Sequence, residues 1–316
     1  MKIWEEKAKF EQEKDQKVQE SVKLTFHGVE GFDVYNCSIP FAWQGKEYIY
    51  GRVEKRDEWA RSWARLFEKT GKDEYTLVKD HMIYQLEDPY ISIIQGEMVL
   101  GGTHVRKRSG EVDTYYGYFY RGKDLNDLVY FTTGPDYMKD IRLVELKDGK
   151  IGVFSRPRNE EIEKKYGSSA MIGFAVIDHL EDLTDDVIFN ATPIEGIFGK
   201  GEWGGCNQAY LLQDGRIGVI GHQSFSQPVE GEEDLAVYVN ISFEFDPVTF
   251  EVTNQKIIGT RGCYPEGPSK RPNLRDCTFT SGIVMREDGK ADLYGGMSDV
   301  EEGRITIAYP FSCPLN

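Results

Sequence analysis

The chain has 316 residues and a formal net charge of −15 at pH 7. This acidic balance argues against nucleic acid or an anionic membrane surface as the main partner, because both reward a basic face. No stretch reaches the roughly 18 to 20 continuous apolar residues that a membrane-spanning helix needs. Aromatic residues make up 13% of the chain beside 33 glycines, which favours many short strands joined by tight turns over a helical bundle.

Residues 1–21 form a predicted N-terminal unit of their own. They are rich in Lys and Glu and predict a charged, weakly amphipathic helix with a solvated face. The segment lacks the apolar run of a secretory signal. The five cysteines of the chain are odd in number and widely spaced, so we expect neither a disulfide framework nor a zinc site, and we expect a cytoplasmic location.

A tight turn that ends in glycine and precedes a short apolar strand occurs five times along the chain. Polar-Gly pairs between apolar runs predict β-hairpins, because glycine accepts the positive φ that hairpin turns demand. Six residues after each turn glycine stands another small residue, which lets strands approach closely in a crowded centre. The turn glycines are Gly45, Gly96, Gly149, Gly215 and Gly289, and the small residues after them are Gly51, Gly102, Ser155, Gly221 and Gly295.

Further strand-like stretches follow each hairpin, two in each of the first four units and one, 304–311, in the last. In the third unit they are 170–178 and 187–192. An unpaired candidate strand lies at 22–29 near the N-terminus. We therefore predict an all-β fold over residues 22–316, a five-bladed β-propeller with four-stranded antiparallel blades, closed by pairing of the N-terminal strand with the C-terminal blade. A pair of β-sandwiches with similar turns is the less favoured alternative.

Basic side chains are expected at one mouth of the propeller channel. In a propeller, the first strand of each blade lines the axis, and the loops between the second and third strands open on the face where those first strands begin. A cluster of cations there, in an acidic chain, favours an anion such as phosphate, which the planar guanidinium group of Arg binds well. The residues that the register places at this mouth are Arg52, Arg156 and His222, with His104 one position late in its unit.

Polar and charged residues also stand near the starts of the otherwise apolar inner strands. Asp88 is the strongest candidate for a functional residue, because Pro89 follows it and removes a backbone donor where the strand begins. The alternative interpretation is that Asp88-Pro89 only marks the start of a strand and has no functional role. The other residues expected to face the substrate are Asn36, Glu87, Asp140, Asn207 and Asp276, with Trp203 as an aromatic platform for a sugar.

One prominent acid among a surplus of Arg and His favours phosphorolysis of a glycoside. The acid would protonate the leaving oxygen, and phosphate would supply the nucleophile. A hydrolase needs a second carboxylate, about 5 to 5.5 Å away for retention or about 6.5 to 9.5 Å away for inversion, and Asp140 and Asp276 are the candidates. A non-catalytic carbohydrate-binding propeller is a third hypothesis.

The residues Glu87-Asp88-Pro89 resemble the Glu-Asp-Pro motif of the five-bladed propeller enzymes of glycoside hydrolase family 130, whose aspartate is the general acid in mannoside phosphorolysis. Segments 139–158 and 202–223 are similar to the family called domain of unknown function 1861. Protozoan members of that family are β-1,2-mannan phosphorylases and mannosyltransferases, classed as glycosyltransferase family 108. This second resemblance covers nearly all of the chain after the N-terminal helix.

The resemblance implies that Asp88 is the general acid or base and that Arg142, Arg156 and His222 contact phosphate. It implies inverting phosphorolysis, or the reverse transfer, of β-1,2-linked mannose, with inorganic phosphate as co-substrate and no metal or other cofactor. It does not choose between phosphorolysis, transfer from a nucleotide sugar and hydrolysis. The expected partner is a small-molecule or oligosaccharide substrate, with no nucleic acid and no membrane.

Overall fold

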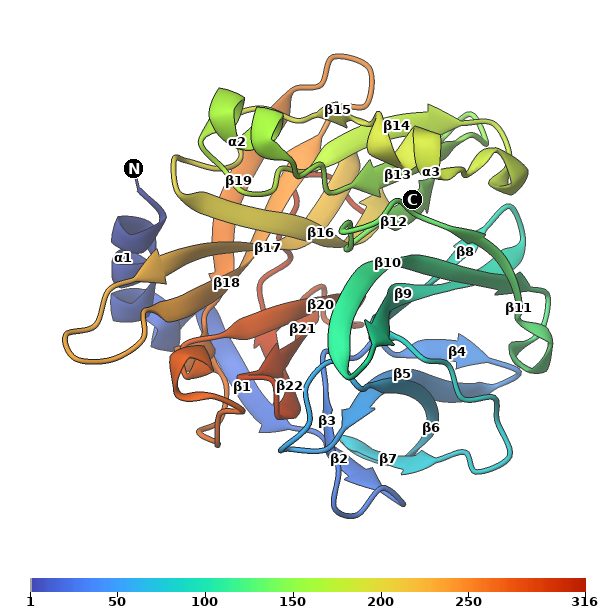
Figure 1. Cartoon of the computed structure of the whole chain (residues 1–316), viewed down its shortest axis with the longest axis horizontal. Helices are drawn as coiled ribbons and strands as arrows, with labels where there is room; N and C mark the ends of the chain where they lie inside the picture. Colours follow the sequence, from blue (N-terminus) through green and yellow to red (C-terminus); the bar gives the residue numbers. More distant parts are fainter. Residues whose placement is uncertain (1) are drawn as a thin grey trace.

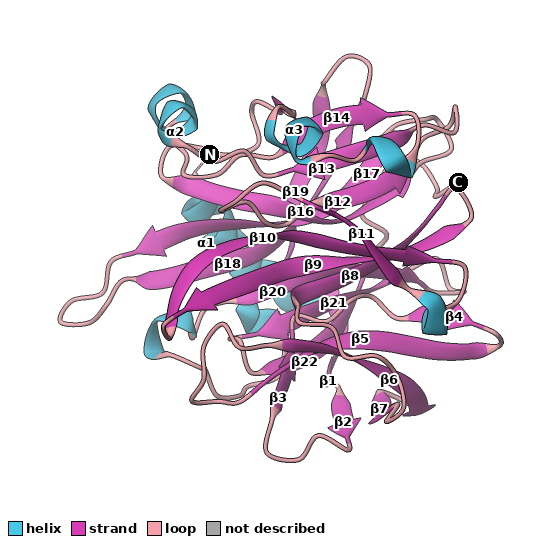
Figure 2. Cartoon of the chain, turned by 45° about the vertical axis from the view of Figure 1, so that its right-hand side comes forward, coloured by secondary structure: helices cyan, strands magenta, loops and turns pink. Residues whose placement is uncertain are grey.

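Residues 2–316 are described by the structure, a computed structural model in which antiparallel strands dominate. The strands form five sheets that stand around a common axis (Figure 1, Figure 2). In every sheet, one of the repeated turn glycines lies in the hairpin between the first two strands and has a positive φ angle. The five-bladed β-propeller predicted from the turn repeat is thus confirmed.

Each of the first three blades is built from the axis outward. Blade 1 has β3 (Asp33–Tyr35) and β4 (Phe41–Trp43) as a divided inner strand, then β5 (Lys46–Glu54), β6 (Trp63–Gly71), β7 (Glu74–Leu77) and the parallel β2 (Thr25–His27). Blade 2 has β8 (Glu87–Ile94), β9 (Glu97–Arg108), β10 (Glu111–Gly122) and β11 (Val129–Thr133). Blade 3 has β12 (Arg142–Glu145), β13 (Ile151–Ser155), β14 (Gly173–Ile177) and β15 (Thr192–Pro193).

The last two blades follow the same order. Blade 4 has β16 (Glu202–Leu211), β17 (Ile217–Gln227), β18 (Leu235–Phe245) and β19 (Val252–Gly259). Blade 5 has β20 (Thr278–Met285), β21 (Ala291–Met297), β22 (Glu301–Ile307) and β1 (Val18–Lys23). The helices are α1 (Ile3–Lys17), α2 (Glu160–Tyr166) and α3 (Asp185–Phe189), with 3-10 turns at Leu125–Asp127, Leu180–Asp182, Arg261–Cys263 and Pro272–Leu274. Within residues 2–316, no helix has the length and apolar character needed to cross a bilayer.

The ring closes through β1, which pairs antiparallel with β22 of the C-terminal blade. Closure by the N-terminal strand is therefore as predicted, but its position differs. The helix ends at Lys17 and the closing strand begins at Val18, inside the predicted unit 1–21. Only the first part of the predicted strand 22–29 closes the ring, since Thr25–His27 crosses to blade 1 and pairs there with β7.

Helix α1 lies at the outer edge of the ring beside β1 (Figure 1). Ile3 and Phe10, two turns apart, are buried in the same apolar cluster as the strands of blade 4. The Lys7 ammonium pairs with the Asp276 carboxylate at 2.9 Å. The helix thus docks along one face instead of lying fully in solvent, and the predicted solvated character holds for its other face, where Lys9 is exposed.

The predicted strand 187–192 is wrong for most of its length. Residues Asp185–Phe189 form a helix, and only Thr192–Pro193 pair as a strand. The side chain of Thr184 caps this helix by accepting from the Val187 amide, and two aspartates stand in its first turn. A cap and acidic residues at a helix N-terminus outweigh the β propensity of a short apolar run.

The hydrophobic core lies between neighbouring blades. The Phe245 ring of blade 4 packs against Phe154 and Phe174 of blade 3, with ring centroids 5.9 Å and 4.9 Å away. Near the axis, neighbouring strands contact each other through their backbones. A Cβ atom on Gly221 would lie 2.5 Å from the carbonyl oxygen of Gly205. At Gly221, the second strand of blade 4 therefore approaches the first too closely for any residue but glycine, as the small-residue repeat predicts.

Replacing Phe10 by Ala should lower the free energy of unfolding by about 3 to 5 kcal/mol, because a buried aromatic ring leaves a cavity. Urea unfolding followed by tryptophan fluorescence measures the change. The matched variant Lys9→Ala, on the exposed face of α1, should stay within about 0.5 kcal/mol of wild type. Equal effects of the two substitutions would contradict docking of α1.

A second prediction concerns Glu302 of β22, which is fully buried and accepts hydrogen bonds from the Cys37 amide at 3.1 Å and the Ser281 hydroxyl at 2.9 Å. Burial raises the pKa of its carboxyl to about 8. Between the ordinary pKa and about 8, the folded protein keeps a proton that the unfolded chain has lost. Stability should therefore fall as pH rises through this window, by roughly 1.4 kcal/mol per pH unit at most.

The measurement is the free energy of unfolding against pH for wild type and Glu302→Gln. The difference between the two proteins should shift in favour of the Gln variant from about pH 5 to 8. A difference that does not change with pH would show that Glu302 titrates alike in both states.

Candidate active site

Three inner-strand entries share one backbone feature. Asn36, Asp88 and Asp140 have φ angles of 47°, 49° and 59°, in the left-handed region that non-glycine residues seldom adopt. The β8–β9 and β16–β17 ladders also shift register where Asp88 and Asn207 stand. All four side chains are buried near the axis. Such strained positions persist where the surrounding structure holds them, and they cluster at functional sites.

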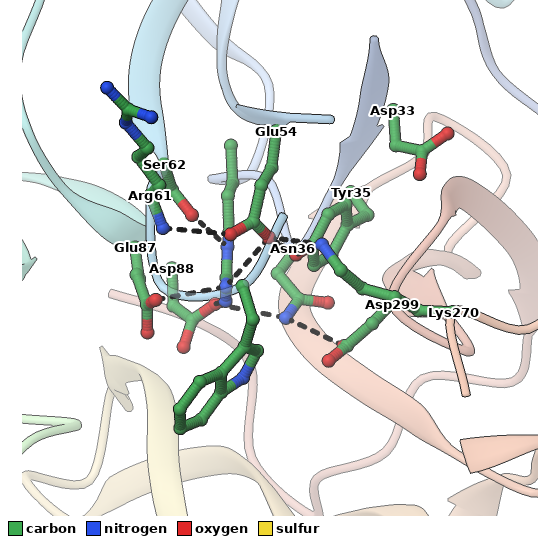
Figure 3. Close-up of polar contacts among 12 residues, drawn as sticks. Asp33, Tyr35, Asn36, Glu54, Arg61, Ser62, Glu87, Asp88, Lys270 and Asp299 are labelled. Carbon is green, nitrogen blue, oxygen red and sulfur yellow. Dashed lines mark hydrogen bonds and ion pairs between the residues drawn. The ribbon is translucent and has the colours of Figure 1, made fainter. Parts of the chain in front are cut away.

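Arg52, near the end of β5, organises the first half of this centre, and its partners Glu54, Ser62, Glu87 and Asp88 are labelled in Figure 3. Its guanidinium group donates to the carboxylates of Asp88 at 2.8 Å, Glu87 at 3.1 Å and Glu54 at 3.3 Å. Its Nε atom donates to the Ser62 hydroxyl at 2.9 Å. With 5% exposure, Arg52 is a buried cation that holds three acids, and it is not free to bind a phosphate ion.

Glu54 joins Arg52 to two other parts of the fold (Figure 3). It accepts from the Tyr35 hydroxyl, the Lys270 ammonium and, at 3.0 Å, the Arg61 amide. Lys270 belongs to the segment between blades 4 and 5, so this carboxylate ties that segment to blade 1. The carboxylate is fully buried and needs these partners, because an unpaired buried charge is costly.

Asp88 presents its two oxygens differently. Its Oδ1 atom is held by Arg52 and by the Asn36 amide at 3.0 Å, whereas Oδ2 has the Lys139 ammonium 3.8 Å away. Asn36 also donates to the Asp299 carboxylate at 3.3 Å, so one amide bridges two acids (Figure 3). The oriented Oδ1 atom fixes the carboxylate and leaves Oδ2 as the atom that can exchange a proton.

The two bridged acids have opposite pKa shifts. Burial raises the pKa of the Asp88 carboxyl, but Arg52 and Lys139 more than offset this, and its net pKa lies below the usual value. For Asp299, burial dominates and its pKa is raised. Asp88 is therefore the stronger acid of the pair in the unliganded protein.

The second half of the centre comes from blades 3 and 4. The Arg156 guanidinium donates to the Asp140 carboxylate at 2.6 Å and to the Gly204 carbonyl at 2.8 Å. Burial raises the pKa of Asp140, but Arg156 and Lys139 outweigh burial and hold it well below the usual range. Lys139 lies between the halves. Burial lowers the pKa of its ammonium, but Asp140 and the other acids outweigh burial and raise the net pKa.

His222 and Arg142 complete this second half around Asn207. The His222 Nδ1 atom shares a hydrogen bond with the Asn207 side-chain oxygen at 2.8 Å, and its Nε2 atom lies 4.0 Å from the Asp140 carboxylate. Burial lowers the pKa of His222 to about 3, so the imidazole is neutral. Arg142 donates to the Asn207 carbonyl at 2.7 Å and lies 4.5 Å from the centre of the Tyr90 ring.

Four buried polar atoms of this centre have no hydrogen-bond partner among residues 2–316. They are Asn36 Oδ1, Asp140 Oδ1, Asn207 Nδ2 and His222 Nε2. Buried polar atoms normally find partners, so several orphans in one place indicate a position for polar ligand atoms or water. They lie on both halves of the centre, beside the acids and beside the basic side chains.

The structure thus brings together most of the residues singled out in the sequence. They are Asn36, Arg52, Glu87, Asp88, Asp140, Arg142, Arg156, Asn207 and His222. Trp203 lies at the rim, where its indole donates to the Tyr238 hydroxyl at 3.3 Å and the Tyr238 ring stacks on His222.

Two predicted residues do not join the centre. His104 donates from Nδ1 to the Gln85 carbonyl at 3.1 Å and packs against Tyr116, because its one-residue offset turns it to the other face of the strand. Asp276 turns outward to Lys7 of α1. It cannot serve as the second carboxylate opposite Asp88.

Two residues of the centre, Lys139 and Asp299, were missed in the sequence. Lys139 precedes Asp140 directly, so its proximity to the register position was a usable signal. Asp299 stands in the turn between β21 and β22, with φ of 57°. Such second-to-third-strand turns open on the axial face, but a single turn aspartate carries no distinctive pattern.

Two solved structures are similar to this chain in both sequence and fold. A mannose phosphorylase from Leishmania mexicana, solved with a phosphate ion, is 52% identical over 99% of this chain and 96% of its own, with a TM-score of 0.92. A GDP-Man-dependent mannosyltransferase from the same organism is 48% identical over 99% and 96% of the two chains, with a TM-score of 0.91. No curated protein sequence matches the chain.

A more distant structure shares the fold alone. The β-1,2-mannobiose phosphorylase from Listeria innocua is 16% identical over 88% of this chain and 91% of its own, with a TM-score of 0.61. A family model described as a protein of unknown function, DUF1861, matches residues 10–313. This match includes all five blades and the whole of the centre described above, so the chain belongs to the DUF1861 family.

Proposed function

We propose that the chain is an enzyme that transfers mannose between a saccharide and phosphate, as an inverting β-1,2-mannoside phosphorylase or in the reverse direction. Asp88 exchanges the proton of the glycosidic oxygen, and the basic side chains of blades 3 and 4 hold phosphate. The observation that carries this proposal is the pairing of one oriented carboxylate with unpartnered polar atoms beside buried cations.

The basic half suits a phosphate ion. Arg142 and Arg156 supply buried positive charge, the partly exposed Lys139 adds a third cation, and Asn207 Nδ2 and His222 Nε2 lack partners among residues 2–316. Burial keeps His222 neutral in the unliganded protein. A bound phosphate dianion would favour the protonated imidazole, whose Nε2 could then donate a hydrogen bond to the phosphate. The mannose phosphorylase that is 52% identical was solved with a phosphate ion, which supports this use of the site.

The acidic half suits proton transfer at the glycosidic oxygen. Asp88 is ionised in the unliganded protein, which equips Oδ2 to take the proton of an acceptor hydroxyl in the synthetic direction. A phosphate dianion bound near the centre raises the pKa of Asp88, which favours the protonated form that phosphorolysis needs. The same carboxyl thus serves both directions.

The other hypotheses have less support. A hydrolase would need Asp140 or Asp276 as a base. Asp140 is ion-paired with Arg156 and has a lowered pKa, and Asp276 faces α1. A purely carbohydrate-binding propeller does not require an oriented acid beside buried cations. Transfer from a nucleotide sugar stays a second candidate, because a GDP-Man-dependent mannosyltransferase is 48% identical to this chain.

Incubation of the protein with β-1,2-mannobiose and inorganic phosphate should release mannose 1-phosphate, detected by coupled assay or NMR. The anomeric proton of the first product should show inversion. Mannose release without phosphate would support hydrolysis instead, and turnover only with GDP-mannose would support the nucleotide-dependent transferase.

Asp88→Asn should lower kcat by about 10² to 10⁴-fold, since the amide cannot exchange the proton. Circular dichroism and the thermal midpoint should show a folded variant, because Asn keeps an oxygen for Arg52 and Asn36. A folded Asp88→Asn protein with wild-type kcat would remove Asp88 from the chemistry.

His222→Gln should raise the KM for phosphate by about tenfold, the effect of losing one good hydrogen bond to an anion. The matched variant His27→Gln, in β2 on the outside of blade 1, should leave that KM unchanged. A rise in the KM for mannobiose alone would place phosphate elsewhere.

A further inference from the structure

A second group of basic side chains lies outside the centre, around a cavity of about 540 Å³ between blades 1 and 2. One wall is the loop between β5 and β6, and the other is the β9–β10 hairpin. Both connections open on the axial face that carries Asp88. The cavity is lined by Ala60, Arg61, Gln85, His104, Val105, Arg106, Lys107 and Gly110.

This cavity adjoins the wall of the Asp88 site. Ala60, Gln85 and Val105 also line a narrow crevice whose other side is formed by Ser62 and Glu87. Ser62 and Glu87 are both hydrogen-bonded to the Arg52 guanidinium, which holds Asp88. One layer of side chains therefore separates the basic cavity from the acid.

The charge of the cavity is positive in a strongly acidic chain. Arg61 has one acidic neighbour, Glu58 at 3.5 Å, and Arg106 has one, Asp113 at 2.7 Å. Lys107 donates to the Trp59 carbonyl at 2.9 Å, and among residues 2–316 no carboxylate lies within 4.0 Å of its ammonium. Cations concentrated beside a catalytic site attract an anion and fix its position.

An aromatic side chain stands at the same rim. The Trp59 indole is 56% exposed, directly before Ala60 of the cavity wall, and the Arg271 guanidinium lies 5.3 Å from its ring centre. An exposed indole beside cations offers an apolar face to a sugar ring and charge to its substituent.

The position of the cavity indicates which part of the substrate it meets. In an inverting displacement, the nucleophile attacks the face of the sugar opposite the leaving group. The proposed phosphate site belongs to blades 3 and 4, and the proton-exchanging Asp88 to blade 2. The cavity between blades 1 and 2 is therefore on the Asp88 side, where the saccharide that gives or accepts mannose lies.

We propose that this cavity binds a phosphate group carried by the saccharide acceptor, so that the enzyme prefers phosphorylated over neutral acceptors. The inference rests on the proposed function for its chemistry. In the synthetic direction, the acceptor oxygen forms the new bond to C1 of mannose 1-phosphate and gives its proton to Asp88. The C1–O bond to phosphate breaks, and phosphate leaves with the electron pair.

The test compares mannose 6-phosphate with mannose as acceptors, with mannose 1-phosphate as donor. The wild-type kcat/KM should be about tenfold higher for mannose 6-phosphate than for mannose, because one charge-assisted hydrogen bond to the phosphate group contributes about that factor. In the double variant Arg106→Ala/Lys107→Ala, this ratio should fall to about one. Arg108→Ala, on the same strand but outside the cavity lining, should keep the wild-type ratio.

Binding of mannose 6-phosphate to Asp88→Asn by calorimetry tests the cavity without turnover. Affinity that depends on Arg106 and Lys107 supports the cavity even if phosphorolysis is absent. Turnover of mannose with no phosphorylated-acceptor preference and no such binding overturns the cavity and leaves the proposed function standing. Loss of GDP binding, and not of mannose 6-phosphate binding, in the double variant overturns the inference in favour of a nucleotide site.

Discussion

The buried guanidinium of Arg52 is the interaction on which the centre of this propeller depends. Four acids, Glu54, Glu87, Asp88 and Asp299, stand on the axial face of a chain that is already strongly acidic. Arg52 donates to three of them and lies over the Tyr35 ring. Without it, uncompensated carboxylates would remain in the interior, a cost of about 3 to 5 kcal/mol for a single broken buried pair.

This arrangement separates two kinds of chemistry around one axis. Blades 1 and 2 hold acids whose charges are met by Arg52, whereas blades 3 and 4 hold the cations Arg142 and Arg156 beside unpartnered atoms of Asp140, Asn207 and His222. Lys139 stands between the halves, 3.8 Å from Asp88. A ligand that bridges an oriented carboxylate and an anion-binding side fits such a division, and glycosyl transfer to or from phosphate has this form.

The propeller makes the separation possible because its first four blades repeat one backbone feature. The inner strand enters the ring through a polar residue in a left-handed or bulged conformation, and the following hairpin returns the chain. Each blade can therefore present a different side chain at an equivalent point. The strain of these entries, on the order of 1 to 3 kcal/mol each, is borne by the packed blades around them.

Much of the fold and part of the centre could be predicted from local patterns. Turn glycines with positive φ repeat in every blade, since hairpin geometry depends on a few neighbouring residues. The same register located Asn36, Asp88 and Asp140, because a strand of known start fixes which residues face the axis. Register failed for His104, where a one-residue offset reverses the side of the strand.

The sequence by itself determined the number of blades, their order and the acid at the entry of β8, because these follow from spacing along one chain. Only the tertiary structure decided which charges meet. It paired Arg52 with three carboxylates, placed Asp299 across Asn36 and directed Asp276 to Lys7 of α1. Apart from Arg52–Glu54, these pairings join distant parts of the chain, and their energy depends on distance and burial, which no local pattern specifies.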